Sequence, residues 1–185
     1  VTFLFTDIEG SMPLWERFPE AMQVALARHD LLLRHAIESA DGSIVKTTGD
    51  GVYAVFGDAG QALAACLAAQ RALQAPDAGG SPPDPSAPVA GPPIALRVRM
   101  GIHTGTPHVA EEGYVGVDVH RAARIAASGH GGQVLISAST RALAGDGFVL
   151  VDIGERRLKD PSPPERVYEL GERELPPLQT AQRSN

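Results

Sequence analysis

TFLFTDIEGS, residues 2–11, is the stretch around which the rest of this chain is organised. Residues 1–6 are β-branched, aromatic and nearly all apolar, which predicts a strand that is buried on both faces. Asp7 stands at the end of this apolar run. Gly10 and Ser11 then predict a turn into a helix, whose first backbone N–H groups would point at whatever Asp7 holds. Taken alone, the stretch is better explained as an ordinary strand-to-helix loop.

A second stretch, IVKTTGDGVYAVF at residues 44–56, predicts a β-hairpin. Two apolar runs flank an Asp-Gly pair, which is a strong hairpin signal. Turn geometry alone explains Asp50, because aspartate tolerates the backbone angles of tight turns. If the fold brings Asp50 beside Asp7, the two carboxylates instead form an oxygen-only site that suits Mg²⁺ or Mn²⁺. Lys46 precedes the turn, and its ordinary role is that of a solvent-facing strand lysine.

Two pairs of basic side chains share a face of an expected element. Period two puts Arg97 and Arg99 on one face of a strand, where they are either a solvated edge or the lining of an anion site. His120 and Arg124 are four residues apart on an expected helix and share one of its faces. That face is either solvated or reaches a ligand or a partner chain.

The remaining pattern predicts an α+β fold with helices packed on a mixed or mostly antiparallel sheet, because hairpins alternate with helical crossovers. A turn at 103–107 is expected to make a hairpin of the strands before and after it. Asp58 and Ser137 are the expected helix N-caps. The expected helices span residues 19–40, 58–75, 115–127 and 137–144, and the further strands span residues 94–102, 108–110, 133–136, 148–153 and 167–170.

The chain predicts one domain over residues 1–170. Its 185 residues, 43% hydrophobic and 21% charged, suffice for one core. Residues 76–93 are almost entirely Pro, Gly, Ala, Ser and Asp, which predicts a flexible surface loop within that domain. Residues 171–185 predict a disordered tail. Because the chain starts on a strand-like run without methionine, we expect fused regulatory domains outside it.

Charge, cysteine content and hydropathy narrow the classes of function. The net charge of -6 argues against general nucleic-acid binding, which usually needs a basic surface. Cys66 is the single cysteine, so no intramolecular disulfide is possible and a cytoplasmic location is expected. No apolar run approaches the ~20 residues that span a bilayer, and no signal peptide is visible. We therefore expect no membrane contact by this domain.

Four motifs together resemble the class III adenylate/guanylate cyclase catalytic domain, most of all its soluble bacterial members. The resemblance runs from Val1 to about Leu170 and implies a ferredoxin-like core of order βααββαβ, extended by further strands and a short helix. The motifs occur in the family's order and are FTDIEGS at 5–11, KTTGDG at 46–51, RMGIHTG at 99–105 and VHRAAR at 119–124.

The resemblance also implies a reaction and an assembly. ATP would be converted into cyclic AMP and pyrophosphate by attack of the ribose 3′-hydroxyl on the α-phosphate, at the interface of a head-to-tail homodimer. Asp7 and Asp50 would hold two Mg²⁺ or Mn²⁺ ions per site, with the Ile8 carbonyl as a further ligand. Arg99 matches the arginine that contacts the leaving phosphates from the same chain. The terminal phosphates would lie against the backbone N–H groups of Glu9, Gly10 and Ser11.

The partner chain would supply the other half of each site. Lys46 matches the lysine that reads the nucleobase, and Arg124 matches the arginine that stabilises charge on the α-phosphate. Lys159 matches a late lysine that binds the triphosphate.

Two positions depart from the family pattern. Gly113 stands where the partner of the base-reading lysine is usually Asp, Thr or another polar residue, and His120 stands where asparagine is usual.

These features leave four functions to weigh. An adenylate cyclase is favoured by Lys46, because a lysine can meet acceptor atoms on adenine. A catalytically weak or inactive cyclase-homology domain, which binds nucleotide or dimerises as a regulatory module, is supported by Gly113 and His120. A guanylate or relaxed-specificity cyclase is the third reading. An unrelated ferredoxin-like binding domain would leave all four motifs coincidental.

Overall fold

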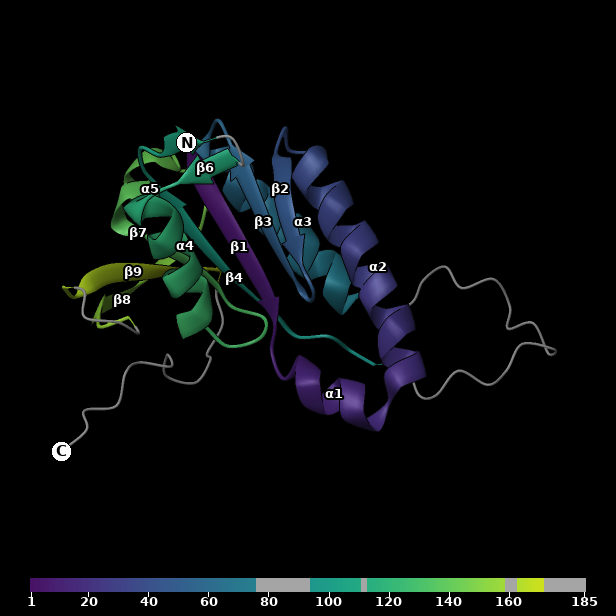
Figure 1. Ribbon diagram of the computed structural model, residues 1–185. Coiled ribbons are helices and arrows are strands. Elements are labelled where there is room, and N and C mark those ends of the chain that lie inside the picture. The colour runs from purple at the N-terminus through teal and green to yellow at the C-terminus, as the bar shows by residue number, and fades with distance from the viewer. Residues whose placement is uncertain (76–93, 111–112, 159–162, 172–185) are drawn as a thin grey trace.

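The computed structural model describes residues 1–75, 94–110, 113–158 and 163–171 (Figure 1). The expected loop at 76–93, Lys159 and the expected tail after Gly171 lie outside the described residues. The strands are β1 (Thr2–Ile8), β2 (Ser43–Thr48), β3 (Gly51–Phe56), β4 (Val98–Thr104), β5 (His108–Ala110), β6 (Gly113–Val115), β7 (Val134–Ser137), β8 (Leu150–Arg156) and β9 (Glu165–Leu170). The helices are α1 (Ser11–Arg17), α2 (Pro19–Glu38), α3 (Ala59–Gln74), α4 (Val117–Ser128) and α5 (Ala138–Leu143).

The main sheet has seven strands in the order β2-β3-β1-β4-β7-β9-β8. All neighbouring pairs in it are antiparallel except β4 and β7. The first seven elements along the chain are β1-α1-α2-β2-β3-α3-β4, which confirms the expected βααββαβ core. The remaining strands extend this sheet from its β4 edge or form the small β5–β6 pair.

Helices cover both faces of the sheet, with α2 and α3 on one side and α4 on the other (Figure 1). Alternate residues of each central strand therefore belong to different cores. On β4, Val98, Met100 and Ile102 join the core under α2 and α3. On β1, Phe3 packs with Val119 of α4 on the opposite side. Asp7 follows Phe3 at even spacing, so it shares the face that α4 covers.

Local signals set several helix ends as expected. The side chains of Asp58 and Ser137 accept hydrogen bonds from the first turns of α3 and α5, which confirms both as N-caps. Pro19 begins α2. Because a residue before proline is pushed out of the helical region, the chain breaks at Phe18 and a separate short helix, α1, precedes α2.

The expected hairpin between residues 94–102 and 108–110 is wrong. β5 pairs with β6 instead, in the register Val109↔Tyr114, and β4 pairs with β1 and β7. Consequently α4 starts at Val117 rather than at 115. Gly116, with φ 126°, stands at its N-cap in a conformation that side chains disfavour. No helix in the described part of the chain is long and apolar enough to cross a bilayer.

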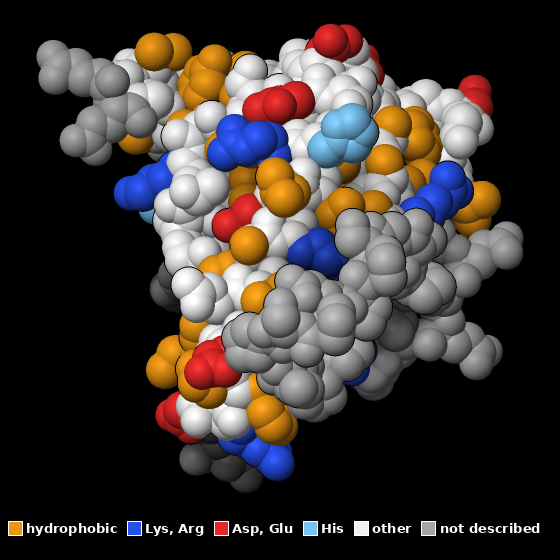
Figure 2. All heavy atoms as spheres, turned by 90° about the vertical axis from the view of Figure 1, so that its right-hand side faces the viewer, with side chains coloured by type: hydrophobic (Ala, Val, Ile, Leu, Met, Phe, Trp, Pro, Cys, Tyr) orange, Lys and Arg blue, Asp and Glu red, His pale blue; other side chains and the backbone are white. Residues whose placement is uncertain are grey.

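Figure 2 shows the face that lies at the right of Figure 1, where small hydrophobic groups lie between charges of both signs. The exposed apolar side chains of α2 include Val24 and Leu31, which are 63% and 69% exposed.

Candidate active site

Asp7 lies near the end of β1 and is bound by Arg99 of β4. The two residues are register partners, so their side chains leave the sheet on the same face. Arg99 Nε donates to Asp7 Oδ2 at 2.7 Å, and Arg99 Nη2 donates to the same oxygen. Both contacts use Oδ2, so Oδ1 is the oxygen that another cation can approach. The guanidinium also reaches α4, since Arg99 Nη1 donates to Ala127 O at 3.4 Å.

Asp50 lies in the β2–β3 turn, at the same end of the sheet as Asp7. A Cβ built on Gly51 would lie 2.5 Å from the carbonyl oxygen of Thr6, so the turn approaches β1 more closely than a side chain would allow. The Val52 amide also donates to Thr6 Oγ1 at 3.0 Å. Asp50 precedes Gly51 and Asp7 follows Thr6. The two aspartates therefore lie on either side of this contact between β3 and β1.

This donor set fits a hard divalent cation. It consists of two carboxylates and, next to Asp7, the Ile8 carbonyl, and all three donors are oxygens. No group of three or more His, Cys, Asp or Glu side chains that could hold a metal occurs in the described ranges. An ion at Asp7 and Asp50 would thus need water or substrate phosphate to complete its shell, as Mg²⁺ sites commonly do.

The segment from Glu9 to Ser11 offers fewer free amides than expected. The Glu9 amide donates to Arg97 O at 2.8 Å, so it is already used. Gly10 adopts a left-handed conformation with φ 71°, and Ser11 then begins α1 without a side-chain cap. The expectation of a backbone phosphate cradle is therefore reduced to the amides of Gly10 and Ser11.

Arg97 and Arg99 contact neighbouring carboxylates rather than forming a free edge. Arg97 Nη1 lies 3.7 Å from Glu9 Oε2, and its Nη2 donates to Gly131 O at 3.0 Å. His130 Nδ1 lies 3.4 Å from the other carboxylate oxygen of Glu9. The part of the candidate site around Arg97 and Arg99 is thus lined by both basic and acidic groups.

Lys46 is exposed and is the register partner of Tyr53 across β2 and β3. A bulge at Val45 interrupts the register between Ile44 and Lys46. Lys46 therefore shares the face on which Tyr53 stacks against Phe5, with ring centroids 4.4 Å apart and an interplanar angle of 11°.

Gly113 lies close to the segment of β2 that carries Lys46. A Cβ built on Gly113 would lie 3.2 Å from Cγ1 of Val45, the neighbour of Lys46. Gly113 has φ 114°, which L side chains rarely adopt. The β6 backbone here is thus suited to glycine and disfavours an aspartate in its place.

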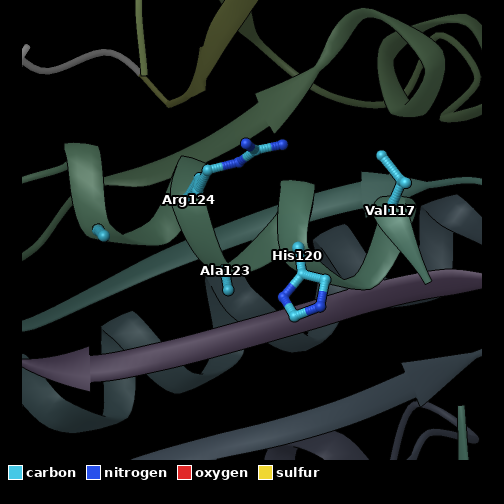
Figure 3. Close-up of a pocket in the computed structure, with 5 residues that line it drawn as sticks. Val117, His120, Ala123 and Arg124 are labelled. Carbon is cyan, nitrogen blue, oxygen red and sulfur yellow. The ribbon is translucent and has the colours of Figure 1, made fainter. Parts of the chain in front are cut away.

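His120 and Arg124 line an open pocket of about 610 Å³ along α4, together with Val117, Ala123 and Ala127 (Figure 3). They share a face, as their spacing predicts. Arg124 Nε is buried and has no hydrogen-bond partner among the described residues. Such a donor is costly to leave unpaired, so it is well placed for a ligand that accepts hydrogen bonds.

The structure groups the predicted residues into three sets. Asp7, Ile8, Asp50, Arg99 and residues 9–11 converge at one end of β1, Lys46 lies near Gly113, and His120 lies with Arg124. Sequence reasoning missed the Phe5–Tyr53 stack and a hydrogen bond between His103 and Asp118. The sequence did offer a signal for the His103–Asp118 contact. The alternation of Arg99, Gly101 and His103 in RMGIHTG places these residues on one face of a strand.

Comparison with known proteins places this geometry in a family. The family model described as the adenylate and guanylate cyclase catalytic domain matches residues 1–170. An uncharacterised protein of Mycobacterium tuberculosis is 34% identical over 195 residues, covering 100% of this chain and 61% of the relative. The adenylate cyclase of Podospora anserina is 31% identical over 220 residues, covering 92% of this chain and 10% of the fungal protein. This chain therefore spans about three fifths of the mycobacterial relative and about a tenth of the fungal one.

Solved structures show the same fold. A structure of adenylate cyclases from Trypanosoma brucei in their monomeric state has a TM-score of 0.78 and 28% identity, covering 98% of this chain and 94% of that chain. The adenylyl cyclase CyaB from P. aeruginosa has a TM-score of 0.72 and 25% identity, with 94% of each chain covered.

Proposed function

Because this chain belongs to the adenylate and guanylate cyclase catalytic domain family, we propose that it converts ATP into cyclic AMP and pyrophosphate. The observation that supports the proposal is that Asp7 and the turn that contains Asp50 lie at the same end of β1, with Arg99 bound to Asp7. Two carboxylates suit divalent cations, and the arginine suits phosphate.

The reaction joins the ribose 3′ oxygen to the α-phosphorus and breaks the bond between the α-phosphorus and the oxygen that bridges it to the β-phosphorus. Pyrophosphate and the proton of the 3′-hydroxyl are released. Mg²⁺ or Mn²⁺, when bound, would activate the 3′-hydroxyl and neutralise phosphate charge. Asp7, Asp50 and the Ile8 carbonyl would hold the ions. Arg99 would exchange its contact with Asp7 for one with the leaving phosphates, because both acceptors are anionic oxygens.

We further propose that each site is shared between two chains arranged head to tail. Lys46 would read the base, and His120 and Arg124 would contact the reacting phosphate, each from the partner chain. Exposed apolar side chains around the α4 pocket support the proposal that a partner chain covers this face. The apolar side chains of Val109, Val115 and Val117 are 81%, 47% and 67% exposed on β5, β6 and α4. Grouped exposed apolar side chains commonly mark an interaction surface.

The test of the function is turnover of the purified protein with MnATP and with MnGTP, with products separated by chromatography. We expect cyclic AMP from ATP. No cyclic product from either nucleotide, from protein that is folded and dimeric, would reject both enzymatic readings and favour a regulatory module.

A relaxed-specificity cyclase is the second candidate, and Gly113 favours it. Lys46 faces the base without a side chain at position 113, and the positive φ there disfavours a replacement. One hydrogen-bonding group discriminates less than a complementary set does. We expect kcat/KM for ATP to exceed that for GTP by only about tenfold. A preference of several thousandfold would mean that other groups read the base.

Mixing two inactive variants tests the shared site. Asp7→Ala removes a metal ligand and Lys46→Ala removes the base reader, so each homodimer has two damaged sites. Random association gives half heterodimers, each with one intact site, and activity should recover to about a quarter of that of the unmodified protein. The measurement is cyclic AMP formation after equal amounts are mixed and equilibrated.

The matched control mixes Asp7→Ala with Asp50→Ala. Both changes affect the half of the site that one chain supplies, so each of the two sites in a heterodimer carries one defect and no activity should return. Mixing Lys46→Ala with Arg124→Ala should behave in the same way. Failure of the Asp7→Ala and Lys46→Ala mixture to recover, or recovery of activity in either control mixture, would contradict the proposed sharing of each site between chains.

A further inference from the structure

A buried polar network joins β4 to the first turn of α4. Its centre is His103, which is only 3% exposed. His103 Nδ1 lies 2.8 Å from Ser137 Oγ, and His103 Nε2 lies 3.2 Å from Asp118 Oδ1. The two ring nitrogens therefore face groups of different chemistry on different elements.

The partners determine where the proton of His103 lies. Burial would raise the pKa of Asp118, but the Thr106 amide, His103 and Arg121 together hold it below its ordinary value. Asp118 is thus a carboxylate that only accepts, and His103 Nε2 must carry the proton. Burial lowers the pKa of His103 despite the opposing effect of Asp118. A neutral ring that donates to Asp118 and accepts from Ser137 satisfies both nitrogens.

Close packing leaves α4 little freedom along β4. A Cβ at Gly101 would overlap the backbone of Ala126, and a Cβ at Gly105 would overlap the side chain of Asp118. Asp118 also accepts from the Thr106 amide at 2.9 Å. The contact between Arg99 and Ala127 O holds the other end of the helix. The helix is therefore anchored to β4 at both ends.

The network continues from Asp118 toward the pocket. Arg121 lies 3.2 Å from Asp118 Oδ1 and 3.3 Å from Glu165 Oε2 on β9. Burial raises the pKa of Glu165, and the positive charges of Arg121 and Arg124 oppose that rise. Arg124, which lines the α4 pocket, thus interacts electrostatically with Glu165, and Arg121 of the network holds Glu165 in place.

We infer that His103 is a positioning residue for the cyclisation: its hydrogen bond to Asp118 sets where α4 lies along β4, and thereby where Arg124 meets the substrate. The inference rests on the proposed function. His103 is buried beneath the helix and acts through Asp118, so it does not itself touch the reacting atoms. Arg124 is proposed to stabilise charge that develops during the reaction. Displacing its guanidinium should therefore lower kcat more than it changes KM.

Two amide substitutions separate the contacts of His103. In His103→Gln, the side-chain nitrogen takes approximately the place of Nε2 and can still donate to Asp118. In His103→Asn, it takes approximately the place of Nδ1, so the contact with Asp118 is lost. We expect kcat for ATP to fall about tenfold in His103→Asn, with KM within about twofold, and to stay within about threefold of the unmodified value in His103→Gln. Melting temperatures of both variants show whether they are equally folded.

Hydrogen exchange of the amides in residues 117–128 gives a readout that does not depend on turnover. Exchange should be faster in His103→Asn than in His103→Gln. Equal losses of kcat in the two variants, or equal exchange, would overturn the positioning role. If the unmodified protein forms no cyclic product while the exchange difference is present, the proposed function fails and the anchoring of α4 by His103 stands.

Discussion

Replacing Asp7 or Asp50 by alanine is expected to abolish the metal-dependent turnover of ATP while the protein stays folded. Each carboxylate lies at the end of a strand or in a turn, outside the hydrophobic cores. The loss follows because two carboxylates are few ligands for a divalent ion, and removing one leaves a single charged donor. We expect kcat/KM to fall by about a thousandfold or more, since a bound ion supplies several kcal/mol of charge stabilisation.

The two variants should differ in one respect. Asp7→Ala also releases Arg99, which loses its carboxylate partner but remains partly exposed to solvent. The cost in the free energy of unfolding should be about 1 kcal/mol or less, as for other partly exposed ion pairs. Thermal unfolding of each variant measures this. A large drop in melting temperature for Asp50→Ala would instead mean that the turn itself depends on that aspartate.

Asp146→Ala is the matched control, because it removes an exposed carboxylate between α5 and β8. Turnover of all three variants should be measured over a range of Mn²⁺ concentrations. Asp146→Ala should keep the activity of the unmodified protein. Undiminished turnover of Asp7→Ala or Asp50→Ala at saturating Mn²⁺ would reject the metal site.

Replacing Arg124 by alanine should lower kcat by about a hundredfold to a thousandfold, the usual cost of removing one donor that stabilises transition-state charge. The KM for MnATP should change much less. Arg124 lines the pocket along α4, and its buried Nε lacks a hydrogen-bond partner within the described ranges. A phosphate oxygen would supply that partner as charge develops on it.

Arg124→Lys separates charge from geometry. Lysine keeps the positive charge but not the planar fork of donors, so it should recover only part of the rate. Arg141→Ala is the control, because it removes an exposed arginine from α5. A proportional rise in KM with unchanged kcat would show that Arg124 binds the substrate and does not stabilise the transition state.

The fold was accessible to sequence reasoning wherever signals were local. The hairpin at the Asp-Gly turn and the N-caps Asp58 and Ser137 follow from spacings within a few residues, whereas the βααββαβ order, with α1 before α2, came from the family resemblance. The pairing of β5 was not accessible. Its three residues carry too little pattern to choose between β4 and β6, and glycines with positive φ at 113 and 116 decide its partner.

Sequence reasoning identified the residues of the candidate site but only some of the contacts between them. Matching motifs pointed to Asp7, Asp50 and Arg99. The sequence did not show that the Arg99 guanidinium binds Asp7 or that the Glu9 amide is already used. Strand register decides both, and register depends on the packing of the whole sheet.

By itself, the sequence determined which chemical groups this protein carries and where the Asp-Gly turn and the N-caps of α3 and α5 fall, because these features depend on neighbouring residues. The tertiary structure decided which of those groups meet. A single bulge at Val45 decides which face of the sheet Lys46 occupies, since side chains alternate along a strand. The approach of Gly51 to Thr6 likewise brings the positions next to them, Asp50 and Asp7, to one end of the sheet although they are more than forty residues apart along the chain, an approach that only long-range packing can create.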